Sequence, residues 1–295
     1  MDVKGMDWDK AWQEKRAQRT SPSRGPSFWD GRAVSFDRAA SESGYVHQFL
    51  SIMKPERPWH VLDMGCGSGL LTFALAPHVK AITAVDYSPK MLSILKDRCR
   101  VYGIGTITAI EGSWEDDWDA RGIGEYDVAI ASRSLVADDL RSSIMKLVTR
   151  ARRRVYISTI VGDGPFDRRL FDAVGRPLDL GPDYIYNYNM LYQMGILANV
   201  AFITERRSRT HEGLDAAVAG MAWMFDNMSP EEEGRLRAYL KAHLVAAPDG
   251  QWTLSYENTV RCAIIWWDTT QGAPAGRERV HADGAQGPRK PRKRL

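Results

Sequence analysis

Short apolar runs alternate with longer amphipathic segments through the first 160 residues of the chain. Strands are predicted where an apolar run is bounded by turn or charged residues, over 61–64, 81–86, 107–111, 126–132 and 155–160. Helices are predicted between them, where apolar positions recur every three or four residues, over 70–76, 88–99 and 140–151. Strands separated by helical segments of this length indicate right-handed βαβ units around a parallel sheet.

The C-terminal third breaks this alternation. Helices are predicted over 183–195, 213–227 and 229–246, and strands over 199–204 and 259–267. The last helix begins with Ser-Pro-Glu-Glu-Glu, which supplies a capping side chain and acids in the first turn. Residues 210–246 are therefore expected to form a helical insertion between the last two strands of the sheet.

The two ends of the chain differ from this body. Residues 1–45 predict a helical lead-in or lid, in which Trp8 and Trp12 share one helix face and a second helix runs up to Pro55. Residues 46–270 are expected to form the main domain. Residues 271–295 are rich in Gly, Pro, Ala and basic side chains without periodicity, so we predict a disordered tail.

Composition narrows the class of protein. The chain is 44% apolar and 26% charged, which is typical of a globular body. Its net charge is +3, but residues 277–295 alone carry +5, so the body is near neutral and gives no sign of a nucleic-acid-binding surface. Three cysteines without a CxxC pair predict no metal site and suit a reducing compartment. No signal peptide or apolar span of ~18 residues is visible, so a cytoplasmic protein is expected.

The stretch WHVLDMGCGSG, residues 59–69, carries the strongest chemical signal. A buried strand that leads into a glycine-rich turn and a helix N-terminus is typical of a site for an adenosine-containing ligand. The dinucleotide fingerprint GxGxxG would need a glycine at Leu70, whereas this chain has GxGxG. Asp63, directly before the turn, would repel a pyrophosphate and attract a cationic ligand.

The run VLDMGCGSGLLTFALA, followed by AVDYSPKML, resembles the class I S-adenosylmethionine-dependent methyltransferases. The first run matches the glycine motif of that family, and Asp86 matches its acid at the end of the second strand. The resemblance covers residues 46–160. It implies a Rossmann-like, doubly wound α/β fold with a mostly parallel seven-stranded sheet, in which the last strand is antiparallel. It also implies S-adenosylmethionine as cofactor and methyl transfer as the reaction.

The resemblance implies roles for particular residues. Asp63, Gly65 and Gly67 would meet the methionine end of the cofactor, and Asp86 would accept both ribose hydroxyls. The remaining cofactor residues that it implies lie in the glycine turn, beside the adenine, or at the end of the fourth strand: Cys66, Gly69, Tyr87, Ser113, Trp114, Ser132 and Arg133.

Several of these residues have a second interpretation. Trp114 could anchor its loop instead of packing on the adenine, and Cys66 could be no more than a small loop residue. Arg133 could bind a carboxylate of the cofactor or of the substrate, or could pair with Asp138 or Asp139.

No motif fixes a catalytic base. His47, Arg133, Tyr184 and His211 are the candidates for a catalytic role. Tyr184 belongs to a stripe with Tyr188 and Tyr192 at helical spacing, which is more typical of core packing than of a substrate site.

The acceptor is expected to be a small molecule. The fourth strand ends in ASRSL, which lacks the Asn/Asp-Pro-Pro-aromatic signature of amino-directed nucleic-acid enzymes of the family. An RNA methyltransferase that uses the basic tail, and a protein that binds S-adenosylmethionine without transferring its methyl group, are the alternatives. No membrane partner is expected, and the oligomeric state, a homodimer included, stays open.

Overall fold

The computed structural model describes residues 5–20, 30, 44–207 and 210–270 of the chain. The basic tail and most of the predicted lead-in, including 21–29 and 31–43, lie outside the described residues. The disorder expected for 271–295 and the lid expected from the whole of 1–45 therefore stay predictions.

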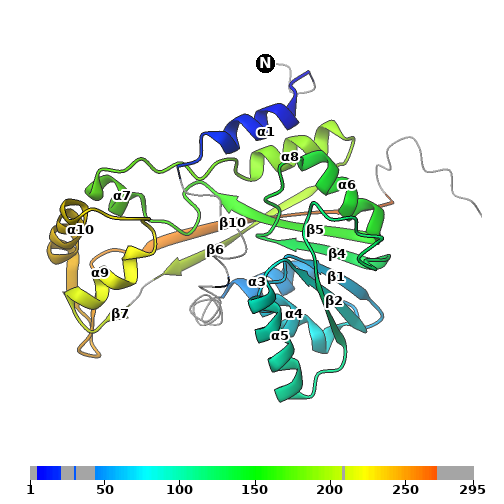
Figure 1. Cartoon of the computed structure of the whole chain (residues 1–295), viewed down its shortest axis with the longest axis horizontal. Coiled ribbons are helices and arrows are strands. Elements are labelled where there is room, and N and C mark those ends of the chain that lie inside the picture. Colours follow the sequence, from blue (N-terminus) through cyan, green and yellow to red (C-terminus); the bar gives the residue numbers. More distant parts are fainter. Residues whose placement is uncertain (1–4, 21–29, 31–43, 208–209, 271–295) are drawn as a thin grey trace, which may run out of the picture.

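A seven-stranded sheet forms the centre of the molecule (Figure 1). Its order is β3-β2-β1-β4-β5-β10-β6. The first five strands run parallel to one another, and β10 is antiparallel to both β5 and β6. The strands are β1 (His60–Met64), β2 (Ala81–Asp86), β3 (Ile107–Glu111), β4 (Tyr126–Ser132), β5 (Ala151–Val161), β6 (Asn199–Arg207) and β10 (Asn258–Asp268). The Rossmann-like fold with an antiparallel last strand is confirmed.

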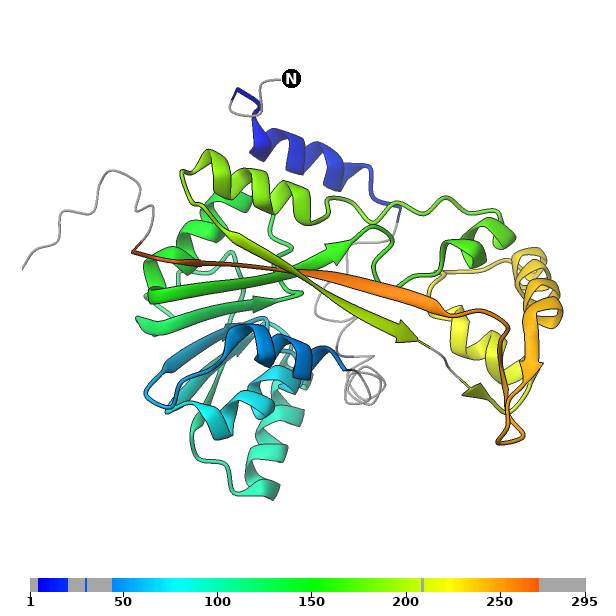
Figure 2. The same ribbon diagram turned by 180° about the vertical axis from the view of Figure 1, so that it is seen from behind.

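Helices cover both faces of this sheet, as Figures 1 and 2 show. One layer holds α1 (Trp8–Ala17), α6 (Leu140–Arg150) and α8 (Tyr184–Gln193). The other holds α3 (Tyr45–Met53), α4 (Leu70–Leu75) with the short 3-10 turn η1 (Ala76–His78), and α5 (Pro89–Tyr102). Trp8 and Trp12 are buried in the same cluster as the strands, so α1 packs as part of the core. Among the described residues, no helix has the length and apolar character needed to cross a bilayer.

Local sequence accounts for most of these boundaries. Ser88 begins α5 by accepting a hydrogen bond from the Met91 amide at 3.1 Å, and Pro89 follows in the first turn. β1 is buried from Val61 to Met64 because β2 and β4 flank it and helices cover both of its faces. The carboxyl ends of β1, β2 and β4 thus meet at one edge of the sheet.

A second lobe lies at the far end of β6 and β10 (Figures 1 and 2). We call it the cap: it contains α7 (Arg168–Val174), α9 (Leu214–Ala222) and α10 (Pro230–His243), which share one apolar cluster. It also holds a small sheet, β7 (Thr210–His211), β9 (Trp252–Leu254) and β8 (Leu244–Ala246). The part of the cap between β6 and β10 holds β7, β8 and β9 besides α9 and α10, so it is not wholly helical and extends past the predicted end at 246. Helix α7 joins this lobe from between β5 and β6.

Two helix ends within the cap differ from the prediction. α9 ends at Ala222 instead of 227, and the turns that follow direct Phe225 into the cap cluster. α10 ends at His243 because residues 244–246 extend and pair with β9. The predicted capping residue Ser229 is confirmed, with Glu232 completing a capping box.

Candidate active site

A cavity of about 390 Å³ lies at the carboxyl ends of β1, β2 and β4. The strand order reverses between β1 and β4, and α/β proteins bind ligands at such a reversal. Residues of α1 and of the loop after β4 complete the wall. The volume falls within the range of small-molecule pockets, roughly 300–1,000 Å³.

Most of the residues predicted for the cofactor lie on this wall: Asp63, Gly65, Cys66, Gly67, Asp86, Tyr87, Ser113, Trp114, Ser132 and Arg133. Gly69 does not. It begins α4 with φ +87°, and a Cβ there would press on Leu95 and Phe73, so its role in the structure is helix packing. The sequence pattern thus identified the wall well, because a parallel sheet brings the carboxyl ends of its strands together.

Asp63 is a buried carboxylate with one unused oxygen. Its Oδ2 accepts a hydrogen bond from Thr72 Oγ1 at 2.7 Å, while Oδ1 has no hydrogen-bond partner among the described residues. Burial raises the pKa of Asp63 to about 6; the Thr72 hydrogen bond opposes the rise, and the charge of Asp86 adds to it. A buried acceptor without a donor is costly, so this oxygen marks a place for a ligand donor.

Asp86 ends β2 and faces the same cavity. Its Oδ2 accepts from the Gly67 amide at 2.8 Å, and its Oδ1 accepts from the Ser88 amide at 2.9 Å. Burial raises the pKa of this carboxyl group, and the backbone hydrogen bonds oppose the rise. The backbone amides of Gly67, Tyr87 and Ser88 do not use every lone pair of this carboxylate, so Asp86 can still accept from a ligand hydroxyl.

The glycine turn depends most on Gly65. Gly65 has φ +74°, and a Cβ there would lie 2.2 Å from the Cβ of Ser134. The amides of Gly65 and Cys66 both donate to the Val85 carbonyl, at 2.7 and 2.9 Å. The turn is therefore pulled onto β2 and wedged against the loop after β4, with no room for a side chain.

Trp114, in the loop after β3, fits both of its interpretations, as a residue of the cavity wall and as an anchor of the loop. Trp114 lines the cavity, and its Nε1 donates to the Ser134 carbonyl at 2.7 Å, so it also anchors the loop. Trp118 lies beside it and donates to the Ser113 carbonyl at 3.0 Å. Ser113 in turn donates its amide to Asp116, the hydrogen bond that chiefly lowers the pKa of that carboxyl.

On the opposite side, hydroxyl groups and an arginine surround Tyr45. The Tyr45 hydroxyl hydrogen-bonds to Ser132 Oγ at 2.8 Å, at the end of β4, and to Ser158 Oγ at 2.5 Å, which lies opposite Ser132 on β5. The Arg133 guanidinium lies 4.3 Å from the centre of the Tyr45 ring. Burial raises the pKa of the Tyr45 phenol, while the charge of Arg133 and the two serine hydrogen bonds oppose the rise.

Helix α1 and the residues directly after it bring Arg16 and Arg19 to the cavity, which the sequence did not reveal. Arg16 donates to the carbonyls of Val136 and Ala137 and pairs with Asp138 at 2.8 Å. Asp138, one of the two acids predicted as a possible partner of Arg133, therefore pairs with Arg16. Asp139, the other offered acid, begins α6 by accepting from the Ser142 amide.

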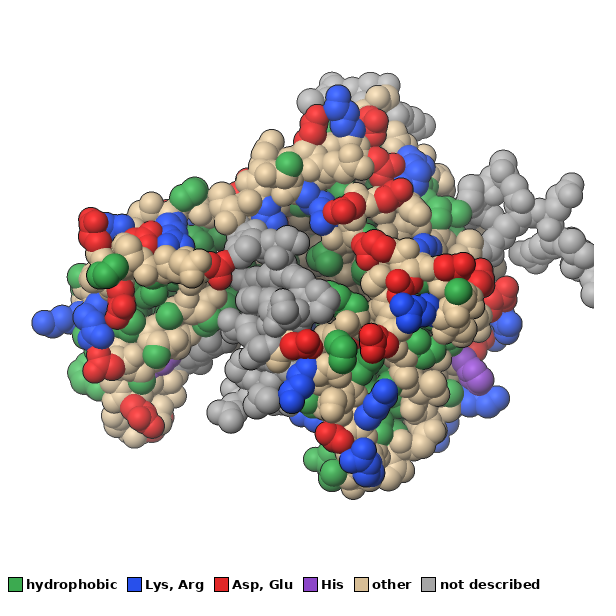
Figure 3. Space-filling model, viewed as in Figure 1, with side chains coloured by type: hydrophobic (Ala, Val, Ile, Leu, Met, Phe, Trp, Pro, Cys, Tyr) green, Lys and Arg blue, Asp and Glu red, His purple; other side chains and the backbone are tan. Residues whose placement is uncertain are grey.

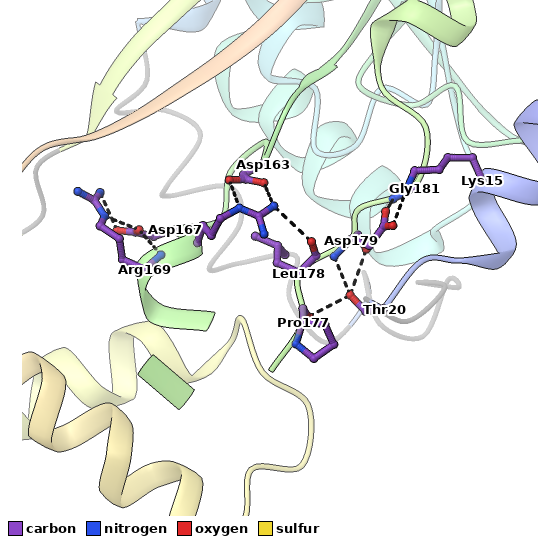
Figure 4. A network of polar contacts seen from close by, with 10 residues as sticks. Lys15, Thr20, Asp163, Asp167, Arg169, Pro177, Leu178, Asp179 and Gly181 are labelled. Carbon is purple, nitrogen blue, oxygen red and sulfur yellow. Dashed lines mark hydrogen bonds and ion pairs between the residues drawn. The ribbon is translucent and has the colours of Figure 1, made fainter. Parts of the chain in front are cut away.

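A polar network fixes the C-terminal end of α1 to the segment between α7 and α8 (Figure 4). Lys15 pairs with Asp179 at 2.5 Å, and Thr20 exchanges hydrogen bonds with the backbone of Asp179. The partners lie 164 residues apart for Lys15 and 159 for Thr20, so no local pattern could predict them. The network fixes the segment that carries Arg16 and Arg19 at the cavity.

Of the four candidates for catalysis, only Arg133 lines the cavity. His47 is exposed on α3. Tyr184 packs edge-to-face on Phe202, which favours the core-packing interpretation. His211 lies in β7 of the cap, against Gly220.

Comparisons with known proteins give the family. Residues 61–155 match the family model described as a methyltransferase domain. An uncharacterised protein of Haemophilus influenzae is 34% identical over 250 residues, which are 82% of this chain and 89% of that one. Magnesium-protoporphyrin O-methyltransferase of Rhodobacter capsulatus is 36% identical over 76 residues, 26% of this chain and 32% of that enzyme.

A solved structure supports the fold. A Bacillus halodurans protein assigned as a methyltransferase superposes with a TM-score of 0.51 at 11% identity, over 76% of this chain and 98% of that one. Its match extends the fold well beyond the 61–155 of the family model. The chain belongs to the class I S-adenosylmethionine-dependent methyltransferases.

Proposed function

We propose that this methyltransferase acts on a small-molecule acceptor, and that cofactor and acceptor occupy two halves of the one cavity. The cofactor half is formed by Asp63, Asp86 and the loop after β3; the acceptor half is formed by α1, Tyr45 and the loop after β4. The observation that carries this division is the distribution of charge: Asp63, Asp86 and Glu115 lie in the first half, whereas the second half holds three arginines and one acid, Asp138.

The cofactor half fits S-adenosylmethionine. The cofactor carries a sulfonium, an ammonium and a carboxylate, a net positive charge that suits a pocket with two buried acids. The unused Oδ1 of Asp63 would accept from its ammonium group. Asp86 would hold the ribose hydroxyls, and Tyr87 and Trp114 would flank the adenine. When bound, the cofactor supplies an electrophilic methyl group, which the acceptor takes up as S-adenosylhomocysteine is released.

The pKa of Asp63 predicts a pH dependence of cofactor binding. A folded-state pKa of about 6, above the ordinary 3.8, means that the folded apoprotein holds a proton that the unfolded chain has released. Its stability should therefore fall as pH rises from about 4 to about 6. Affinity for S-adenosylhomocysteine should change in the opposite direction, rising about tenfold between about pH 5 and pH 7, because only ionised Asp63 pairs with the ammonium.

Isothermal titration calorimetry across this pH range measures the effect. The variant Asp63→Asn should bind more weakly at pH 7 and should lose the rise in affinity. If the affinity of Asp63→Asn rose with pH by the same factor, a group other than Asp63 would be responsible for the pH dependence.

An acceptor of nucleic-acid type is the alternative to test. On the face drawn in Figure 3, basic and acidic side chains are interspersed and no wide basic patch appears over the described residues. Phosphate-backbone binding needs such a patch or the basic tail. Truncation after residue 270 should leave the affinity for S-adenosylhomocysteine unchanged, and the full chain should show no salt-sensitive RNA binding. RNA binding that disappears with the tail would overturn the small-molecule proposal.

A further inference from the structure

We propose that the methyl acceptor carries a carboxylate, and that Arg133 binds it in the acceptor half of the cavity. This inference rests on the proposed function, because it concerns the acceptor of the same site. The residues that carry it are Arg133, Tyr45 and the two serines beneath them.

Strand register places Arg133 away from the cofactor acids. Asp63 on β1 lies opposite Ile130 on β4, and Ser132 on β4 lies opposite Ser158 on β5. The Tyr45 hydroxyl bridges these two serines, so its position is over β4 and β5 and on the far side of β4 from β1. The guanidinium beside the Tyr45 ring therefore faces the acceptor half.

The donors of this guanidinium are available to a ligand. Within the described part of the chain, Arg133 has no ion pair, and its side chain makes no hydrogen bond. A cation over an aromatic face uses that face only, so the five in-plane N–H groups stay free for a planar, bidentate partner. Arg16, by contrast, is committed to two carbonyls and to Asp138.

The arginine is also held in position before any ligand arrives. Its backbone has φ +56°, in the left-handed region that a branched-chain or long residue rarely adopts. Its amide donates to both the carbonyl and the hydroxyl of Ser158, each at 3.0 Å. Below it, Tyr45 is buried and donates its amide to Glu205 at 3.1 Å. Strained backbone held by its surroundings is typical of functional positions.

The surrounding charges favour an anion. Arg16, Arg19 and Arg133 face this half, with Asp138 as the acid among them. The cofactor half carries Asp63, Asp86 and Glu115 instead. A cationic cofactor and an anionic acceptor would each meet the complementary half, which orients the two reactants before transfer.

The test uses benzoate and its neutral analogue benzamide as probes. First, the affinity of the full-length protein for S-adenosylhomocysteine is measured; then the protein saturated with that product is titrated with each probe. We expect benzoate to bind about tenfold more tightly than benzamide, as for a charge-assisted bidentate contact. Arg133→Met should abolish this preference, and Arg133→Lys should retain part of it. Methionine imposes no new backbone strain, because its φ requirement equals that of arginine.

The control is Arg57→Met, an exposed arginine before the amino end of β1, which should keep the full preference. The proposed function fails if the wild-type protein does not bind S-adenosylhomocysteine at all. The carboxylate inference alone fails if that product binds but benzoate shows no advantage, or if the advantage survives in Arg133→Met. It also fails if Arg133→Met weakens binding of the product more than about tenfold, since Arg133 would then serve the cofactor.

Discussion

Replacing Gly65 with alanine should destabilise the protein by about 2–5 kcal/mol and should remove measurable binding of S-adenosylhomocysteine. Two costs combine: a left-handed backbone without glycine, roughly 1–2 kcal/mol, and overpacking against Ser134, roughly 1–3 kcal/mol. The clash is with a Cβ held close to the backbone, so no flexible chain end can move aside. The displaced turn would also lose the hydrogen bond that the Gly65 amide donates to the Val85 carbonyl.

Thermal or urea unfolding and calorimetric titration measure the two effects. Gly103→Ala is the matched control, since Gly103 has φ +63° but open space where its Cβ would lie. It should cost only the backbone term of about 1–2 kcal/mol and leave ligand affinity intact. Equal losses in the two variants would show that Ser134 does not restrict the turn.

Replacing Asp86 with alanine should weaken binding of S-adenosylhomocysteine by a factor of at least about 100. A carboxylate that accepts two ligand hydroxyls makes two charge-assisted hydrogen bonds, worth roughly 1.5–3 kcal/mol each. The variant also frees the amides of Gly67 and Ser88, which shape the turn. Asp86→Asn should lose less, because it keeps one acceptor oxygen in place.

The control acid for this experiment is Asp97, which pairs with Arg100 on the exposed surface of α5. Asp97→Ala should bind the ligand like the wild-type protein. Circular dichroism and unfolding confirm that each variant is folded before titration. Undiminished affinity in Asp86→Ala would contradict the placement of the ribose on β2.

Sequence pattern predicted the part of the cavity wall that is built from the ends of β1 and β2 and the turn between β1 and α4. Asp63, the glycine turn and Asp86 all stand at the ends of strands whose apolar runs are visible in the sequence. Because parallel strands end at a common edge, their side chains meet without further information. The apolar runs also predicted the first and last residues of β2, β3 and β4 correctly.

The acceptor half could not be predicted in this way. Tyr45 and Ser158 meet across 113 residues, and Arg16 reaches the Ala137 carbonyl across 121. Such contacts depend on how α1 and α3 pack on the sheet, which periodicity alone leaves open. From the sequence, Asp138 could pair with Arg133. Its partner in the structure is Arg16, because α1 packs beside the loop after β4.

In the cap, several elements are too short to be predicted from hydrophobic periodicity. Its strands β7, β8 and β9 have two or three residues, too few for apolar alternation to appear. The seven-residue helix α7 was missed as well, although Asp167 at its start and Gly175 at its end are ordinary helix signals. Short elements depend on the packing of the lobe that contains them.

A crystal structure of the complex with S-adenosylhomocysteine tests the central claim most directly. The two-half cavity predicts ribose hydroxyls within about 3.2 Å of the Asp86 carboxylate and the ammonium group at Asp63 Oδ1. It also predicts that the space beside Arg133 and Tyr45 stays open to a second ligand. A ligand held by Arg133 with Asp63 and Asp86 left unused would contradict it.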